Sequence, residues 1–202
     1  MTRRRSAAVA LALLGVEVAG CAPLAAPSPG PQIGEHSDDS GVVVREDLSQ
    51  RFIALVGPEV QIEPPFFGTP DTNVARLRSF LDRRTGETAH QLYVTASYNG
   101  NHDWNAAHDN AGRMLVFFPM SRFEIACEGK DKCFYAEEFA AKFPESELSQ
   151  NRGGFSITFT DQAGNAQTVP VSAAQIAAQL TALADLQKRM AAVPPASTTA
   201  AR

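Results

Sequence analysis

The sequence predicts a mainly β fold: an antiparallel, sandwich-like domain over about residues 42–190 with one C-terminal α-helix. Most of the chain consists of short runs of β-branched and aromatic residues separated by turn residues such as glycine, proline, asparagine and aspartate. After these runs comes one long stretch with helical periodicity. The chain has 202 residues, 44% of them hydrophobic, which is enough for a buried core. An α+β arrangement is the alternative.

The first half of the domain contains a series of strand-like segments, namely residues 42–44, 52–56, 60–62, 74–81 and 91–98. One of them is ambiguous, because Val74, Leu77 and Leu81 also fit one face of a helix. Turn residues at 82–87 follow it, and residues 91–98 then have strong β character. A β-hairpin is therefore the simpler interpretation.

The second half is predicted to contain a polar loop and two hairpins. Residues 99–112 form the loop, with one helical turn expected around residues 105–109. The remaining predicted segments are strands at 114–118, 122–126 and 133–139, a connection at 143–152, and a final hairpin of residues 154–160 and 168–171. Because Cys127 and Cys133 flank the polar turn between strands, the first of these hairpins is expected to be closed by them.

A helix is predicted after residue 172. Ser172 and Gln175 have the spacing of a capping box, in which each side chain hydrogen-bonds the backbone N–H of the other residue. An apolar stripe follows at Ile176, Leu180, Leu183, Leu186 and Met190, opposite Gln179, Asp185 and Lys188. Packing of this stripe on the sheet is the expected role. Residues 191–202 are rich in proline, alanine, serine and threonine and are predicted to be disordered.

The N-terminus has the anatomy of a signal peptide, predicted to be residues 1–20. Arg3, Arg4 and Arg5 precede the apolar run 7–16. Ten helical residues rise about 15 Å, whereas the hydrocarbon core of a bilayer is about 30 Å thick. The run is therefore too short to remain as a transmembrane helix.

Residues Val18, Ala19, Gly20 and Cys21 follow this run and resemble the lipobox of bacterial lipoprotein precursors. The resemblance implies cleavage before Cys21 and transfer of a diacylglyceryl group to its thiol. It places the protein in the cell envelope, facing the periplasm, and Ala22 in place of an aspartate favours the outer membrane over the inner membrane. The alternative is an ordinary secretory signal with an incidental cysteine, since Glu17 departs from the usual pattern.

Residues 21–41 are predicted to form the lipidated N-terminus and a flexible tether. The segment is rich in proline, alanine and serine and has no periodic apolar face. Such a segment can hold a domain away from a membrane.

Cys127 and Cys133 are expected to form a disulfide. Disulfides persist in exported proteins, and a close cysteine pair in such a protein forms a disulfide more often than a metal site. Two free thiols are the alternative if the protein is not exported.

The charge of the chain argues against nucleic-acid binding. The formal net charge is −4, and the arginines gather only in short clusters such as Arg76, Arg78, Arg83 and Arg84. A protein that neutralises phosphates needs a larger basic surface.

The best candidate for chemistry is the loop that contains His102, Asp103, His108 and Asp109, with His90 expected nearby across the hairpin. Imidazole and carboxylate groups could bind zinc or another divalent metal. The spacing of these residues matches no recognised ligand motif, and the alternative is a solvated loop that Trp104 anchors. No catalytic residue and no cofactor are predicted, because no nucleophile or phosphate-binding motif occurs.

The leading functional hypothesis is a non-enzymatic, membrane-anchored lipoprotein that acts through contacts with envelope proteins or the cell wall. Residues 77–87 and 91–94, and the turn between the cysteines, resemble hairpins of uncharacterised proteobacterial envelope proteins, a resemblance that implies no activity. The rival hypotheses are a periplasmic hydrolase or metal-binding protein that uses residues 102–109, and a binder of small ligands.

Overall fold

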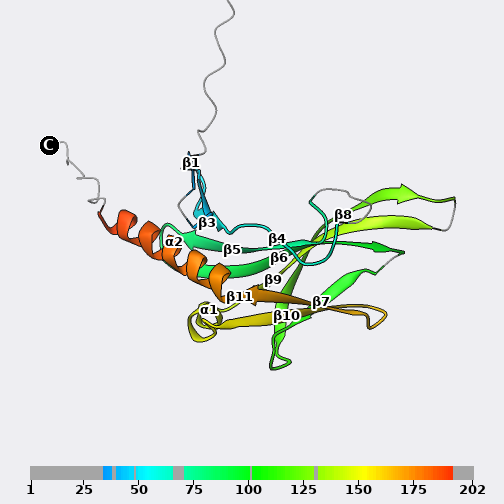
Figure 1. Ribbon diagram of the computed structural model, residues 1–202. Coiled ribbons are helices and arrows are strands. Elements are labelled where there is room, and N and C mark those ends of the chain that lie inside the picture. Colours follow the sequence, from blue (N-terminus) through cyan, green and yellow to red (C-terminus); the bar gives the residue numbers. More distant parts are fainter. Residues whose placement is uncertain are drawn as a thin grey trace, which may run out of the picture. The chain divides into compact units, whose positions relative to one another are not determined.

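The computed structural model describes residues 34–37, 40–47, 49–65, 71–100, 102–129 and 132–192, and all of them lie in the compact unit Pro31–Arg202. This unit is mainly antiparallel β with one long C-terminal helix, which confirms the predicted fold class (Figure 1). The predicted signal peptide, Cys21 and residues 193–202 of the predicted tail lie outside the described residues.

The strands are β1 (Gly34–Ser37), β2 (Val43–Glu46), β3 (Phe52–Val56), β4 (Val60–Gln61), β5 (Val74–Asp82), β6 (Thr88–Asn99), β7 (Trp104–His108), β8 (Met114–Cys127), β9 (Cys133–Phe143), β10 (Gly154–Asp161) and β11 (Ala166–Ser172). The helices are α1 (Glu145–Gln150) and α2 (Ala173–Ala192). β1 lies within the segment predicted to be a tether and pairs with β2, so the sheet begins before Val42.

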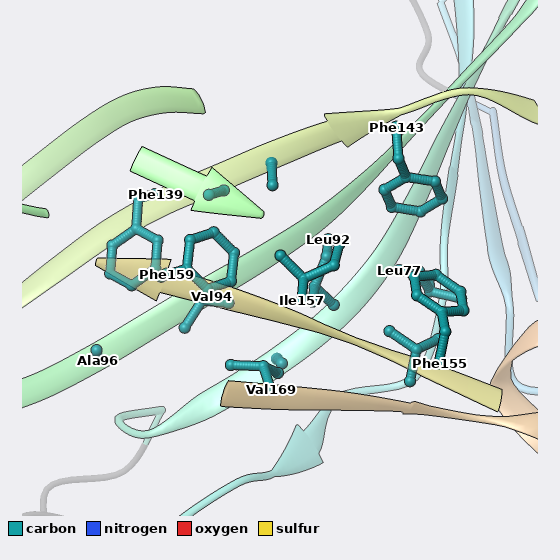
Figure 2. Close-up of a cluster of buried hydrophobic side chains, with 14 of the residues drawn as sticks. Leu77, Leu92, Val94, Ala96, Phe139, Phe143, Phe155, Ile157, Phe159 and Val169 are labelled. Atoms are coloured by element: carbon teal, nitrogen blue, oxygen red, sulfur yellow. The ribbon is translucent and has the colours of Figure 1, made fainter. Parts of the chain in front are cut away.

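One antiparallel sheet of eleven strands has the order β1-β2-β3-β5-β6-β9-β8-β7-β10-β11, with β4 paired to β5. The sheet folds back on itself, because β10 and β11 share one buried cluster with β5, β6 and β9. In Figure 2, Phe139 of β9, Phe159 of β10 and Val94 of β6 belong to this cluster. Both layers of the predicted sandwich therefore come from a single curved sheet.

The pleat of β6 and β9 explains which side chains enter this core. Leu92, Val94 and Ala96 alternate along β6 and are buried, because successive strand residues point to opposite faces. Their partners in the register of β9 are Ala141, Phe139 and Glu137. Glu137 therefore shares the inner face of the sheet with Phe139, at the position where the core meets a group of polar residues.

The capping box at the start of α2 is confirmed. The backbone N–H of Gln175 donates to Ser172 Oγ at 3.2 Å, and the backbone N–H of Ser172 donates to Gln175 Oε1 at 2.9 Å. Ile176 joins the main core, while Leu183 and Leu186 pack in a second cluster with residues of β2, β3 and β5. The predicted packing of the apolar stripe on the sheet is thus confirmed.

The predicted polar position of Gln179 is wrong. Its side chain is buried, and its Nε2 donates to the Leu55 carbonyl oxygen at 3.1 Å and to Ser79 Oγ at 2.8 Å. The sheet supplies acceptors for both N–H groups of this buried amide, whereas its Oε1 has no hydrogen-bond partner among the described residues.

Three other local predictions need correction. Residues 104–108 form strand β7 and not a loop or helical turn, because they pair with both β8 and β10. The predicted connection 143–152 contains helix α1. The two predicted strands before Cys127 are one strand, β8, whose register with β9 shifts between Pro119 and Ser121. Among the described residues, no helix is both long and apolar enough to cross a membrane.

Candidate functional site around His102

His102 lies where β6, β7 and the turn between β10 and β11 meet. It stands between the end of β6 and the start of β7, and Trp104 of β7 pairs with Asp161 of β10. His102 Nδ1 and Asp161 Oδ2 are 2.8 Å apart. The curved sheet thus joins two residues that are 59 positions apart in the sequence.

Aromatic rings hold the imidazole on two sides. The His102 ring stacks on Trp104 with centroids 5.5 Å apart and an interplanar angle of 7°. Tyr98 meets His102 edge to face at 4.4 Å. Trp104 is itself buried and packs against Phe139 of the core. The orientation of the imidazole is therefore fixed by the hydrophobic core.

Asp161 is prepared to accept hydrogen bonds. Its side chain is fully buried, and it accepts from the Asn165 backbone N–H at 2.7 Å and from Asn165 Nδ2 at 2.6 Å. Burial alone would raise the pKa of Asp161, but the hydrogen bonds from Asn165 and His102 outweigh it and lower the pKa. An ionised Asp161 favours the proton of His102 on Nδ1, which leaves Nε2 as the nitrogen available to a ligand.

A second polar pair lies next to this one. The Tyr98 hydroxyl donates to Glu137 Oε2 within the buried end of the sheet. Burial raises the pKa of both groups, and the bond to Glu137 raises that of Tyr98 further. Glu137 therefore keeps its proton to higher pH than an exposed glutamate does.

Tyr98, His102 and Trp104 border a shallow cavity of about 290 Å³, whose lining also includes Glu63, Ser97 and Gln167. Its mixture of aromatic faces and polar groups suits a small polar ligand. The Ser97 hydroxyl donates to Asn73 Oδ1 at 2.8 Å, so it is not activated by His102. The chemistry that this geometry supports is binding, or proton transfer at His102.

The four residues proposed as metal ligands do not converge. Asp103 Oδ1 binds Arg122 Nη1 at 2.8 Å, and Asp109 pairs with Arg113 and accepts from the Ala111 backbone N–H. His108 lies on β7 opposite Met114 and Thr158. Within the described ranges none of the four belongs to a group that could hold a metal; the group found there is Glu124, Cys127 and Cys133.

His90 is also separate from this site. It lies on β6 eight residues before Tyr98, which corresponds to roughly 26 Å along a strand. His90 is fully buried, and Ser79 Oγ lies 2.7 Å from its Nδ1. Gln179 donates to the same Ser79 Oγ, so His90, Ser79 and Gln179 form one buried polar chain away from His102.

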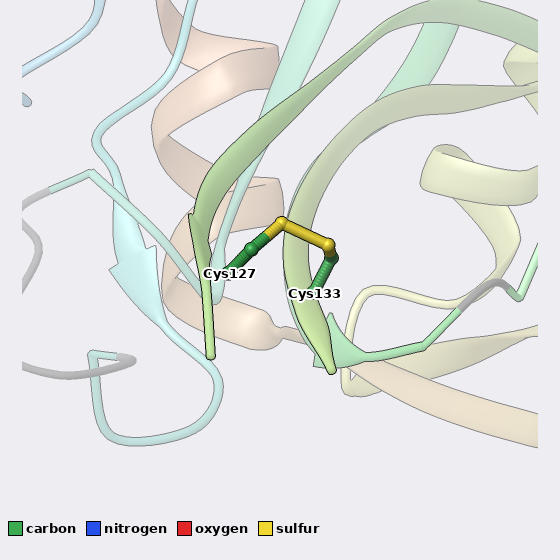
Figure 3. The surroundings of a disulfide bond; sticks show 2 residues. All are labelled: Cys127 and Cys133. Atoms are coloured by element: carbon green, nitrogen blue, oxygen red, sulfur yellow. A yellow bond between two sulfur atoms is a disulfide. The ribbon is translucent and has the colours of Figure 1, made fainter. Parts of the chain in front are cut away.

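Cys127 and Cys133 lie opposite each other at the ends of β8 and β9, with their sulfur atoms 1.99 Å apart (Figure 3). This is the bonding distance of a disulfide, as the sequence predicts. With both sulfurs joined, the nearby Glu124 has no thiolate partner for a metal.

A feature that the sequence analysis missed is a row of exposed apolar side chains on β8. We call these residues the β8 apolar row: Met114, Val116, Phe118, Met120 and Phe123, with exposed fractions of 67%, 58%, 36%, 44% and 47%. Leu115 and Phe117 between them pack against the core. The alternation along residues 114–118 was visible in the sequence, but each residue on the outer face is apolar where a solvated strand would carry polar residues.

No motif in the sequence identifies Tyr98, Glu137 and Asp161 as neighbours of His102. Asp161 was recognisable only as a turn residue, since the turn between β10 and β11 uses the same carboxylate that binds His102. Comparison with protein-family models, with curated proteins and with solved structures finds no match to this chain.

Proposed function

We propose that the protein is a lipid-anchored component of the bacterial cell envelope that acts by binding another envelope protein and not by catalysis. The observation that carries this proposal is the β8 apolar row. Large apolar side chains that follow one another along a strand remain in water at a cost of about 25 cal/mol per Å² of apolar surface, unless another molecule covers them.

The position of the row supports binding over a defect in packing. It lies on the outer face of the hairpin formed by β8 and β9, and the disulfide joins the ends of these strands. Ala136 and Ala140 on β9 are fully buried beside it, in register with Phe123 and Phe118. Because Ala136 and Ala140 are small, the rings of Phe118 and Phe123 beside them stay exposed on this face.

The anchor is the second part of the proposal. Cys21 receives the lipid, residues 22–33 act as a spacer, and the outer membrane is the favoured location because Ala22 follows the cysteine. Intact mass of the protein extracted from membranes tests this part. We expect an acylated N-terminus at Cys21 that is absent from Cys21→Ala; an N-terminus at another residue would contradict it.

In-cell photo-crosslinking tests the binding part. A photoreactive phenylalanine analogue at Phe118 should form adducts with another envelope protein, and the same analogue at exposed Lys188 of α2 is the matched control. Adducts at Phe118 alone support the proposal. No adducts at Phe118, or equal amounts of adduct at both positions, would count against it.

The His102 site favours a second candidate, a periplasmic hydrolase. The four loop residues do not form a ligand set within the described ranges, so this candidate depends on His102 and Asp161 acting in proton transfer beside the cavity. Replacing His102 with alanine should abolish a cellular function that needs this chemistry. A function that survives His102→Ala and fails on Phe118→Lys supports binding by β8 instead.

A further inference from the structure

One edge of β8 is open over most of its length. β7 pairs with β8 only at Met114 and Leu115, whereas β9 pairs with it up to Cys127. Every residue from Phe118 to Glu124 is exposed. An edge strand of this kind presents backbone N–H and C=O groups that another strand can pair with.

The charged residues along this edge are complementary to those of a second, antiparallel copy of the same strand. Arg122 and Glu124 flank Phe123, and residues two apart on a strand lie on the same face. When two copies of the strand pair antiparallel with Phe123 opposite Phe123, Arg122 of each copy faces Glu124 of the other. The twofold symmetry forms this ion pair twice, and the Phe123 pair lies midway between them along the strand, on the opposite face.

We infer that two copies of this chain associate through the open edges of β8 in this register. The regular part of β8 supports this register. Its pairing with β9 shifts between Pro119 and Ser121 and again between Glu124 and Ala126. Residues 121–124 lie between these irregularities and include the ion-pairing residues. The Cys127–Cys133 disulfide holds the end of the strand in its paired form before association, which lowers the ordering cost.

The dimer goes beyond the proposed function, since pairing of the edges requires neither the lipid anchor nor another protein. Its consequence is geometric. A twofold axis perpendicular to the joined sheet leaves both β8 apolar rows on the same face. A partner with two matching sites would then meet both rows at once, and the second contact would form within one complex.

Charge reversal tests the register. Full-length chains with two different tags are co-expressed, extracted in mild detergent and purified through one tag, and the second tag is quantified. Wild-type chains should co-purify. Arg122→Glu expressed with itself, and Glu124→Arg with itself, should reduce co-purification by about tenfold, because like charges then face each other twice. Arg122→Glu expressed with Glu124→Arg should restore it, since both pairs are again opposite in sign.

Arg122 also binds Asp103 within its own chain, so Asp103→Asn is the matched control. It removes the same internal ion pair but keeps Arg122 and Glu124, and it should co-purify like the wild type. Restoration in the mixed pair also shows that both variants fold. Absence of wild-type co-purification, unchanged co-purification of the single variants, or no restoration in the mixed pair would overturn the dimer. Adducts of Phe118 with another protein would in that case leave the proposed binding role standing.

Discussion

β8 and β9 are neighbouring strands of one hairpin, yet they meet opposite environments. Most β9 side chains are buried, whereas nearly all of β8 is exposed or half-buried. The difference comes from position in the sheet: β9 has β6 on one side and β8 on the other, while β8 has β9 alone over most of its length. Figure 1 shows the paired strands running together to the end of the unit away from α2.

In the proposed function, β9 stabilises the fold and the outer face of β8 binds the partner. The aromatic residues of β9 contribute to the core, since Phe139 packs on Trp104, Phe117 and Phe159. The aromatic residues on the outer face of β8 are exposed and contribute little to the core, so they are available for binding. Substitutions in the two strands should therefore have different consequences.

The largest expected effect contrasts Phe139 with Phe123. Phe139 is fully buried, so Phe139→Ala should lower the free energy of unfolding by about 3–5 kcal/mol through lost burial and the cavity left behind. Phe123 is 47% exposed, and Phe123→Ala should change it by less than about 1 kcal/mol. Urea denaturation of both variants measures the difference. Equal losses would mean that β8 belongs to the core and not to a binding surface.

The titration of His90 tests whether water is excluded from the buried residues around Phe143 of β9. His90 is fully buried against Phe143 of β9, and burial lowers its pKa to about 4. The unfolded chain takes up this proton near pH 6.5, whereas the folded chain does so only near pH 4. Acidification from pH 7 to pH 4 therefore favours unfolding, and it should remove up to about 3 kcal/mol of stability through this group.

Unfolding curves of wild type and His90→Leu between pH 4 and pH 7 measure this contribution. The His90→Leu variant should lose less stability on acidification than the wild type. Phe143→Leu is the control, because it disturbs the same packing without removing a titratable group. A wild type and a His90→Leu variant with the same pH dependence would show that water reaches His90.

The disulfide connects the two environments at the far end of the hairpin. Removing it in the double variant Cys127→Ser with Cys133→Ser should lower the free energy of unfolding by up to about 2.4 kcal/mol, from the entropy of closing so short a loop. Hydrogen exchange should quicken in residues near the cystine and remain slow in β5 and β6. Faster exchange throughout the sheet would instead make the hairpin part of the cooperative core.

The sequence predicts the fold class of this protein much better than its site. Alternation along β6 and β10 and the spacing of Ser172 and Gln175 are local signals, and the structure confirms the strands and the capping box. The pairing of His102 with Asp161 depends on how the sheet curves, and local periodicity does not contain that information. β7 was missed for a related reason: its residues have weak β propensity, and pairing with two neighbours makes them a strand.

Burial of Gln179 and exposure of the β8 apolar row are the corresponding errors in reading hydrophobicity. The helical pattern places Gln179 toward solvent, although acceptors on β3 and β5 take both hydrogen bonds of its amide nitrogen. The sequence places Phe118 and Phe123 in strands but does not say which face of the strand is covered, because the order of strands in the sheet decides that. Hydrophobic pattern identifies a strand, whereas topology decides which of its faces is buried.

The smallest expected effect is at the contact between the exposed faces of the two strands. Ser121 of β8 donates to Glu138 of β9 at 2.6 Å, on the outer face. Because water competes for both groups, Ser121→Ala should lower the free energy of unfolding by no more than about 1 kcal/mol, measured by urea denaturation. Ser149→Ala on α1, where another exposed hydroxyl donates to the Ser146 carbonyl oxygen, is a matched control. A loss at Ser121 as large as that of Phe139→Ala would mean that the outer face of β8 stabilises the fold, and the distinction between the two strands would then fail.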